Sequence, residues 1–136
     1  PEGGYYRETY RSTGLIQVGS LPSSMGEARN YATAIYFMLR HGEVSRFHRI
    51  QSDELWFFHA GATLEISIVH EHGRLDQLVV PAQAWFGARV IAGFSPFALV
   101  SCVVAPGFDF KDFQLATADD LRQWPTMTEV PDLCPL

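Results

Sequence analysis

The stretch GEVSRFHRIQSDELWFFHAG, residues 42–61, decides the fold that we expect for this chain. Its β-branched and aromatic residues, bracketed by glycines, predict two strands joined by a turn at residues 51–53. Because successive side chains of a strand point to opposite faces, His48 and Glu54 can share the inner face of a β-hairpin. The same face then carries three apolar side chains: Ile50, Trp56 and Phe58.

Such a hairpin places an imidazole and a carboxylate in a mostly apolar cavity. In this environment pKa values shift and proton transfer becomes efficient. We therefore expect His48 to act as a base, with Glu54 orienting it or sharing its proton. The alternative is structural: the two side chains only hydrogen-bond each other and nearby backbone, as buried polar groups generally do.

Short β-type runs separated by turn residues make up most of the remaining sequence. The clearest runs are GGYYRETY, TAIYFMLR, LEISIVHEHG, LVVPAQAWFGARVI and FALVSCVVAPGFDF. Only TADDLRQW, residues 117–124, is typical of a helix, since Thr117 can cap it and Pro125 ends it. We expect one all-β domain over residues 1–136, a sandwich or barrel with one short C-terminal helix. Because the chain starts at Pro1 without an initiator Met, we also expect sequence ahead of it.

The composition argues against several classes of partner. The net charge is -5 and the ten Lys and Arg residues are scattered, so no basic stripe is present and we expect no nucleic acid partner. No apolar run approaches the ~20 residues that cross a bilayer, so we expect no membrane partner. Two distant cysteines, Cys102 and Cys134, suggest neither a disulfide framework nor a zinc ribbon, which favours a cytoplasmic location.

The opening stretch resembles the first motif of the cupin superfamily. That motif runs Gly, five residues, His, one residue, His, three residues, Glu, six residues, Gly. The matching positions here are Gly42, His48, Ile50, Glu54 and Gly61, so four of the five landmarks agree and an isoleucine replaces the second His. In VVPAQAWFGAR, which is similar to the second motif, Pro81 is present while Gln83 replaces Gly and Phe86 replaces the third His ligand.

A closer resemblance covers most of the chain. PEGGYYRETYRS, TAIYFML, SRFHRIQSDELWFFHAG, VVPAQAW and CVVAPGFDFKDFQLA look like one uncharacterised family of RmlC-like cupins, classed with the sugar-nucleotide epimerase-like cupins. The resemblance implies a double-stranded β-helix (jelly roll) and a homodimer, but no established reaction. Members of that family usually have a longer segment where only RLDQL separates Gly73 from Val79.

A bound metal is not expected. Catalytic zinc sites usually have three protein ligands, and the facial iron triad needs two histidines and a carboxylate. His48 and Glu54 are the two ligands that the sequence offers, since Ile50 and Phe86 cannot ligate. A metal would need a third ligand from outside the motif, and His59 should face the other way.

Five residues are candidates for substrate binding. Arg7, like Arg11 on the same strand, could bind an anionic group in a bidentate manner. Trp56, Phe58 and Trp85 could form a stacking wall, although aromatic packing in the core is the alternative. Tyr36 could donate a hydrogen bond.

Together these features predict a protein that binds a small polar metabolite, carbohydrate-like by resemblance, and that acts as an isomerase or epimerase if it is catalytic. Two alternatives stay open. One is metal-dependent cupin chemistry, and the other is a non-catalytic ligand-binding or sensor domain.

Overall fold

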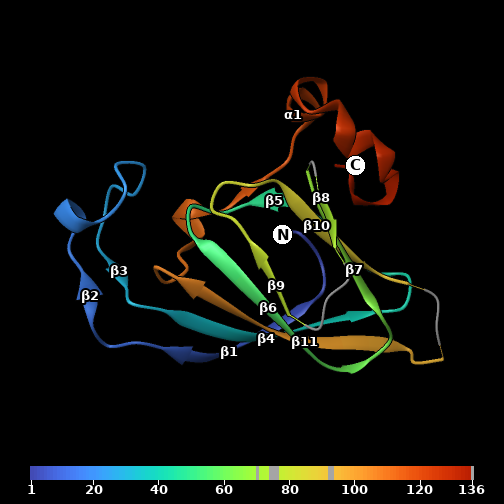
Figure 1. The fold of residues 1–136 in the computed structure, drawn as a ribbon, viewed down its shortest axis with the longest axis horizontal. Helices are drawn as coiled ribbons and strands as arrows, with labels where there is room; N and C mark the ends of the chain where they lie inside the picture. Colours follow the sequence, from blue (N-terminus) through green and yellow to red (C-terminus); the bar gives the residue numbers. More distant parts are fainter. Residues whose placement is uncertain (70, 74–76, 92–93, 136) are drawn as a thin grey trace.

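The structure is a computed structural model that describes residues 1–69, 71–73, 77–91 and 94–135 (Figure 1). The expected loop difference at RLDQL lies largely outside these residues. The strands are β1 (Tyr5–Arg11), β2 (Leu15–Ile16), β3 (Arg29–Asn30), β4 (Thr33–Arg40), β5 (Val44–Arg49), β6 (Asp53–Gly61), β7 (Leu64–Ile68), β8 (Glu71–Gly73), β9 (Gln77–Val80), β10 (Phe86–Val90), β11 (Phe97–Ala105) and β12 (Gln114–Leu115). The helical elements are α1 (Ala118–Gln123) and the 3-10 turns η1 (Val18–Ser20), η2 (Phe110–Asp112), η3 (Pro125–Glu129) and η4 (Pro131–Leu133).

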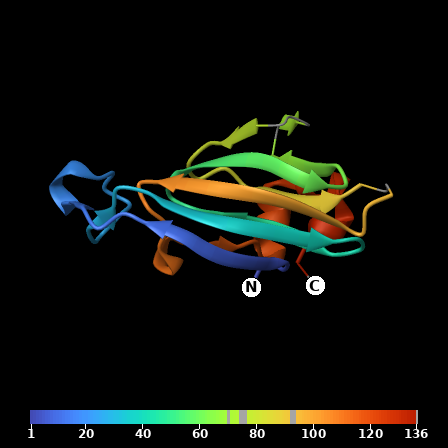
Figure 2. The ribbon, with the colours of Figure 1, turned by 90° about the horizontal axis from the view of Figure 1, so that it is seen from below.

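Two five-stranded antiparallel sheets face each other as a jelly roll. The first sheet has the order β1-β4-β11-β6-β9 and the second β12-β5-β10-β7-β8, while β2 and β3 form a small separate ribbon. Figure 2 shows β1, β4 and β11 side by side, with the β2–β3 ribbon projecting beyond them. The expected all-β class is confirmed, and so is the short helix, which starts in a capping box between Thr117 and Asp120.

The predicted hairpin across residues 42–61 is wrong. β5 pairs with β10 and β12, whereas β6 pairs with β11 and β9, so the two strands belong to opposite sheets. The connection at residues 50–52 crosses from one sheet to the other, which is how a jelly roll alternates its strands. His48 and Glu54 still share the interior, because each lies on the inner face of its own sheet.

The turn at residues 81–84 stabilises this crossing through two hydrogen bonds. The backbone N–H of Gln83 donates to the carbonyl of Ile50 at 2.8 Å, and that of Ala82 donates to Asp53 Oδ1 at 2.8 Å. Gln83, which stands where the second cupin motif has glycine, takes a φ of 64°. The fold therefore keeps the left-handed backbone of this turn although the sequence has lost the residue that adopts it most readily.

Two hydrophobic clusters hold the layers together. The first fills the space between the sheets and includes three buried rings: Phe37, Trp56 and Phe86. The second lies on the outer face of the second sheet, where the C-terminal segment covers it (Figure 1). Its six buried residues are Phe47, Trp85, Ala116, Met127, Val130 and Leu133. No helix among the described residues is long and apolar enough to cross a bilayer.

A buried ion pair ties the β2–β3 ribbon to the loop that follows β11. Arg29 donates from Nε and Nη2 to the two carboxylate oxygens of Asp112 at 2.8 and 2.7 Å, and its side chain is 4% exposed. Asp112 lies in η2, so this bidentate pair fixes residues 108–113 relative to the ribbon. The position of that loop matters because it closes the cavity described below.

The two motif glycines give the first testable prediction. Gly42 and Gly61 have φ of 83° and 99°, but a Cβ on Gly61 would lie 2.1 Å from the carbonyl oxygen of Phe97, whereas a Cβ on Gly42 would meet nothing within 4 Å. Gly42→Ala should lower the free energy of unfolding by about 1–2 kcal/mol, the cost of a left-handed alanine. Gly61→Ala should cost clearly more, because backbone must also move. Urea unfolding of both variants measures the two changes in unfolding free energy. Equal losses would contradict the close approach of Gly61 to the Phe97 carbonyl.

Candidate functional site

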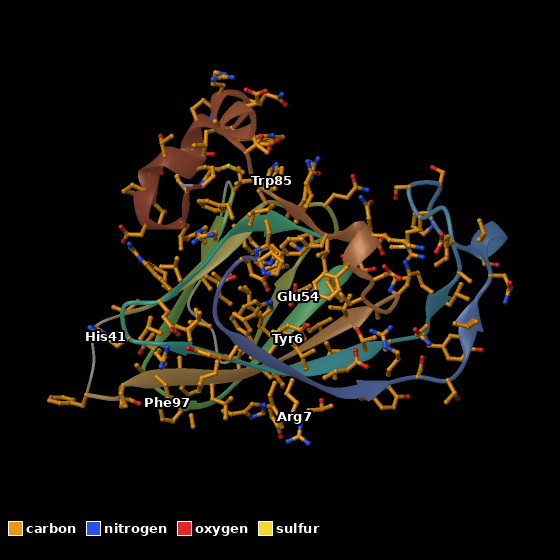
Figure 3. All side chains as sticks on the ribbon, turned by 180° about the vertical axis from the view of Figure 1, so that it is seen from behind. Tyr6, Arg7, His41, Glu54, Trp85 and Phe97 are labelled. Carbon is orange, nitrogen blue, oxygen red and sulfur yellow. The ribbon has the colours of Figure 1, made fainter. Side chains whose placement is uncertain are left out.

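A cavity of about 330 Å³ opens between the sheets. Its walls come from the inner faces of β1, β4, β5, β6 and β11 and from the loop at residues 108–113. Tyr6 and Phe110 line it and are more than half exposed, so they mark the mouth, whereas His48 and Glu54 are buried deeper inside. Figure 3 shows Tyr6 and Glu54 directed into this interior. The volume suits a small metabolite.

His48 is held as a neutral base. Its Nδ1 lies 2.7 Å from the carbonyl oxygen of Arg46, and because a carbonyl only accepts, Nδ1 carries the proton. Nε2 is then left with a lone pair. The ring lies between those of Phe86 and Phe113, with centroid distances of 4.2 and 5.3 Å. Burial lowers the pKa of His48, which keeps the imidazole uncharged.

Glu54 is a buried carboxyl without a cationic partner. It is 8% exposed, and burial raises its pKa to about 7. The negative charge of Glu2 raises the pKa further, while the Cys102 thiol and the Trp56 indole act in the opposite direction. Among the described residues no Lys, Arg or His nitrogen lies within ion-pair distance of this carboxyl. Of the structural alternative, the bond to backbone is present at His48 Nδ1, whereas no direct bond between His48 and Glu54 is found.

This arrangement brings a proton acceptor and a proton donor to one cavity. A neutral imidazole can remove a proton from a bound molecule. A carboxyl with a pKa of about 7 is protonated in about half of the molecules at neutral pH and can supply one. Environments that push two titratable groups in opposite directions are typical of acid–base catalysis.

Three aromatic residues were expected to form a stacking wall, and they do not lie together. Trp56 is on the inner face beside Glu54 but is buried in the core, against Phe37 and Phe86. Phe58 is 39% exposed and lies outside the cavity, and Trp85 packs beneath the C-terminal segment with Arg49 over its ring. The alternative of aromatic packing is thus what the structure shows for Trp56 and Trp85.

Arg7 and Tyr36 were expected at the substrate, and their placement is a second correction. Both are exposed, pair with each other across β1 and β4, and lie on the outer face; Figure 3 shows Arg7 pointing away from Glu54. Their neighbours Tyr6, Glu8 and Ile35 line the cavity, so regular alternation turns Arg7 and Tyr36 outward. A β-bulge between Glu8 and Tyr10 then shifts the alternation of β1. Arg11 thereby reaches the cavity, where it lies beside Glu8.

Several lining residues were missed by the sequence reasoning. Tyr6, a possible acid or hydrogen-bond donor from sequence like Tyr36, does line the cavity, whereas Glu8 on the same face of β1 was missed. Alternation alone could have linked the two once the sheet order was known. The three phenylalanines of the loop, Phe108, Phe110 and Phe113, carry no signal that separates lining from core packing. Cys102 is buried, and its thiol borders Glu54.

The residues present do not fit a metal ion. Ile50 and Phe86, at the positions of the second and third histidine ligands, surround His48 with apolar groups. His59 lies on the outer face, where its Nε2 is 2.9 Å from Ser101 Oγ. Within the described residues no three His, Cys, Asp or Glu side chains are grouped so that they could hold an ion. We therefore derive no chemistry through a metal here.

The two-sheet jelly roll and its interior cavity define the cupin class. A model of the Cupin_5 family, described as cupin superfamily (DUF985), matches residues 1–116, and the chain belongs to this family. A protein of Shewanella oneidensis is similar in structure, with 37% identity, a TM-score of 0.81 and coverage of 98% of this chain and 88% of that one.

Two further relatives extend the comparison. A hypothetical protein from Leishmania major is 31% identical, with a TM-score of 0.83 and coverage of 95% of this chain and 89% of that one. An uncharacterized protein of Saccharomyces cerevisiae is 26% identical over 140 residues, which is 88% of this chain and 70% of that protein. These relatives establish the fold and the family, and their names assign no reaction.

The raised pKa of Glu54 predicts a pH-dependent stability difference. Between the ordinary value of 4.5 and the folded value of about 7, the unfolded chain loses the proton first, so the stability contributed by Glu54 falls as pH rises through this window. His48, whose folded pKa is lowered, acts with the opposite sign below 6.5. The difference in unfolding free energy between Glu54→Gln and wild type, taken at each pH, therefore reports the contribution of the Glu54 carboxyl.

Relative to wild type, Glu54→Gln should gain about 3 kcal/mol of unfolding free energy between about pH 4.5 and about pH 8. Denaturant titrations at several pH values measure it. Glu129→Gln, an exposed control, should show no such trend. A pH-independent difference for Glu54→Gln would mean that its carboxyl titrates normally.

Proposed function

We propose that this cupin binds a small polar metabolite in the cavity and moves a proton to and from it, as an isomerase or epimerase does. His48 Nε2 is the base and the Glu54 carboxyl is the acid, and no metal takes part. The observation that carries the proposal is the pairing, in one cavity, of a neutral imidazole whose Nδ1 is fixed by backbone with a buried carboxyl that has no cationic partner.

The proton balance is simple. His48 takes a proton from a carbon of the substrate next to a carbonyl group, and Glu54 delivers its proton to the neighbouring carbon or oxygen. The imidazolium and the carboxylate then return to their starting states by exchange with water at the mouth. The bond from Nδ1 to the Arg46 carbonyl remains throughout and stabilises the charged ring.

Catalysis predicts a loss of turnover without a loss of fold. His48→Gln and Glu54→Gln should each slow proton exchange between a bound metabolite and deuterated water by ~100-fold or more, the usual scale for losing a general acid or base. A screen of hydroxy- and keto-metabolites by NMR supplies the assay. His59→Gln, on the outer face, is the matched control and should leave the rate unchanged, as should a chelator.

A different outcome would favour the non-catalytic alternative. If wild type binds a metabolite but exchanges none of its protons, and both variants lose binding and melting temperature together, the cavity is a binding or sensor site. Loss of activity with EDTA would instead support a metal-dependent enzyme.

We also propose that the protein is a homodimer that associates through the first sheet. The C-terminal segment covers the outer face of the second sheet, so the first sheet offers the free outer face. Tyr36 on β4 is 47% exposed there, edge-on to His59 on β6, and Tyr5 on the edge strand β1 is equally exposed. Such aromatic side chains are enriched at interfaces. Free Cys102 and Cys134 fit the cytoplasmic location that we propose with it.

The interface is testable by mass. Light scattering at tens of micromolar should give twice the chain mass, and Tyr36→Glu should shift the protein to monomer without changing its circular dichroism. Tyr31→Glu, at an even more exposed tyrosine outside the first sheet, should leave the dimer intact. A monomeric wild type would exclude this assembly.

A further inference from the structure

We infer that the ligand of the cavity carries a positively charged amine rather than a phosphate or carboxylate. The inference rests on the proposed function for the use of the cavity, and it narrows the class of molecule. It also departs from the anionic ligand expected when Arg7 and Arg11 were considered from sequence.

The first observation is that the hydrogen-bond donors of Arg11, the one Lys or Arg among the described residues that line the cavity, are nearly all in use. Arg11 donates from Nε and Nη2 to the carboxylate of Glu8 at 3.1 and 2.8 Å. Its Nη1 donates to Asn30 Oδ1 at 2.9 Å and to the carbonyl oxygen of Phe108 at 3.2 Å. A guanidinium has five N–H groups, so one remains for a ligand. That is too few for the bidentate binding of a phosphate or carboxylate.

The second observation is a surplus of carboxylates among the lining residues. Four line the cavity, from four different parts of the chain: Glu2, Glu8, Glu54 and Asp109. Glu8 is neutralised by Arg11. Glu54 and Asp109 form no ion pair within the described part of the chain. Asp109 nevertheless raises the pKa of Arg11, Arg29 and Lys111, so its charge is partly balanced by theirs. Glu54 is the acid that no cation compensates, and when ionised it would repel an anionic ligand and attract a cation.

The third observation is independent of charge: the wall beside these acids is aromatic. The rings of Phe108 and Phe110 have a centroid distance of 5.0 Å, and those of Phe110 and Phe113 one of 6.4 Å. Phe113 stacks in turn on His48. Aromatic faces attract ammonium groups, and the attraction grows when water is excluded.

Glu54 is what makes the acidic lining a built site. It is more than nine-tenths buried, directed into the cavity, and has no cation beside it. A bound ammonium group would supply the missing partner and would favour the ionised carboxylate. During turnover the ammonium group can return a proton to this carboxylate, so Glu54 can still deliver one to the substrate. Glu54 faces Glu2 from the N-terminal segment, Cys102 from β11 and the neutral ring of His48 from β5, so no other described group competes for that role.

A set of matched small probes tests the charge preference. Benzylamine, benzyl alcohol and benzoate share one ring and differ in charge, and choline and 3,3-dimethylbutanol share one shape and differ in charge. Calorimetry or ligand-observed NMR should rank each cation at least about tenfold tighter than its neutral isostere, with benzoate and inorganic phosphate weakest. Neutral or anionic probes that bind as tightly as the cations, or a failure of every cation to bind, would overturn the inference.

A pH series assigns the effect to Glu54. Choline keeps its charge at every pH, so any pH dependence of its affinity reports the protein. Its affinity should rise about three- to tenfold from about pH 6 to about pH 8 in wild type, and Glu54→Gln should abolish the rise. If the choline affinity of Glu54→Gln still rises with pH, the cation binds at another group and the assignment to Glu54 is wrong. Glu129→Gln is the control.

The inference and the proposed function fail in different ways. If an anionic metabolite exchanges its protons through His48, the proposed enzymatic function is supported and the inference of an amine ligand is wrong. If amines bind tightly but none of them exchanges protons, the amine site is supported and the proposed enzymatic function is wrong.

Discussion

The crossing between the two sheets at residues 50–52 is the constraint on which the site depends. It sends β5 and β6 to opposite sheets, so that one inner face presents His48 and the other presents Glu54. Two backbone N–H groups of the turn at residues 81–84 hold the crossing in place: one donates to the carbonyl of Ile50 and the other to the carboxylate of Asp53. A slip of one residue in either strand would turn its polar side chain out of the cavity, because side chains alternate. The strained backbone of Gln83 persists because these two hydrogen bonds require it.

The mouth of the cavity depends on a different interaction, the buried pair of Arg29 and Asp112. Burying two charges costs more than their attraction returns unless the geometry is good and further bonds satisfy the remaining donors. Both conditions hold here, since the pair is bidentate and Arg29 also donates to the carbonyls of Glu27 and Ala28. An apolar pair could give similar stability but would not fix one orientation of the loop at residues 108–113. The pair therefore serves specificity of structure more than stability.

The sequence predicted the part of the site that depends on alternation within a strand. His48, Ile50 and Glu54 all line the cavity, and Thr33–Arg40 is a strand over its whole predicted length. It did not predict which strands pair, because a turn at residues 51–53 is equally compatible with a hairpin and with a crossing. The prediction for Arg7 failed because alternation does not tell which face of β1 is the inner one. A bulge after Glu8 then places Arg11 on the other face from Arg7, and no residue type in YYRETYR marks it. Contacts made by the loop at residues 108–113 depend on tertiary structure and have no local signal.

The buried carboxyl of Glu54 lowers the stability of the fold while serving the proposed function. A leucine at Glu54 would fill the interior without the free-energy cost of burying an ionisable group. Desolvation raises the pKa of this carboxyl to about 7 and outweighs the Cys102 thiol and the Trp56 indole, which lower it. The ionised carboxylate is therefore unfavourable in the folded interior. The proposed ligand would offset this cost, because a molecule that binds the folded protein and not the unfolded chain adds to its stability.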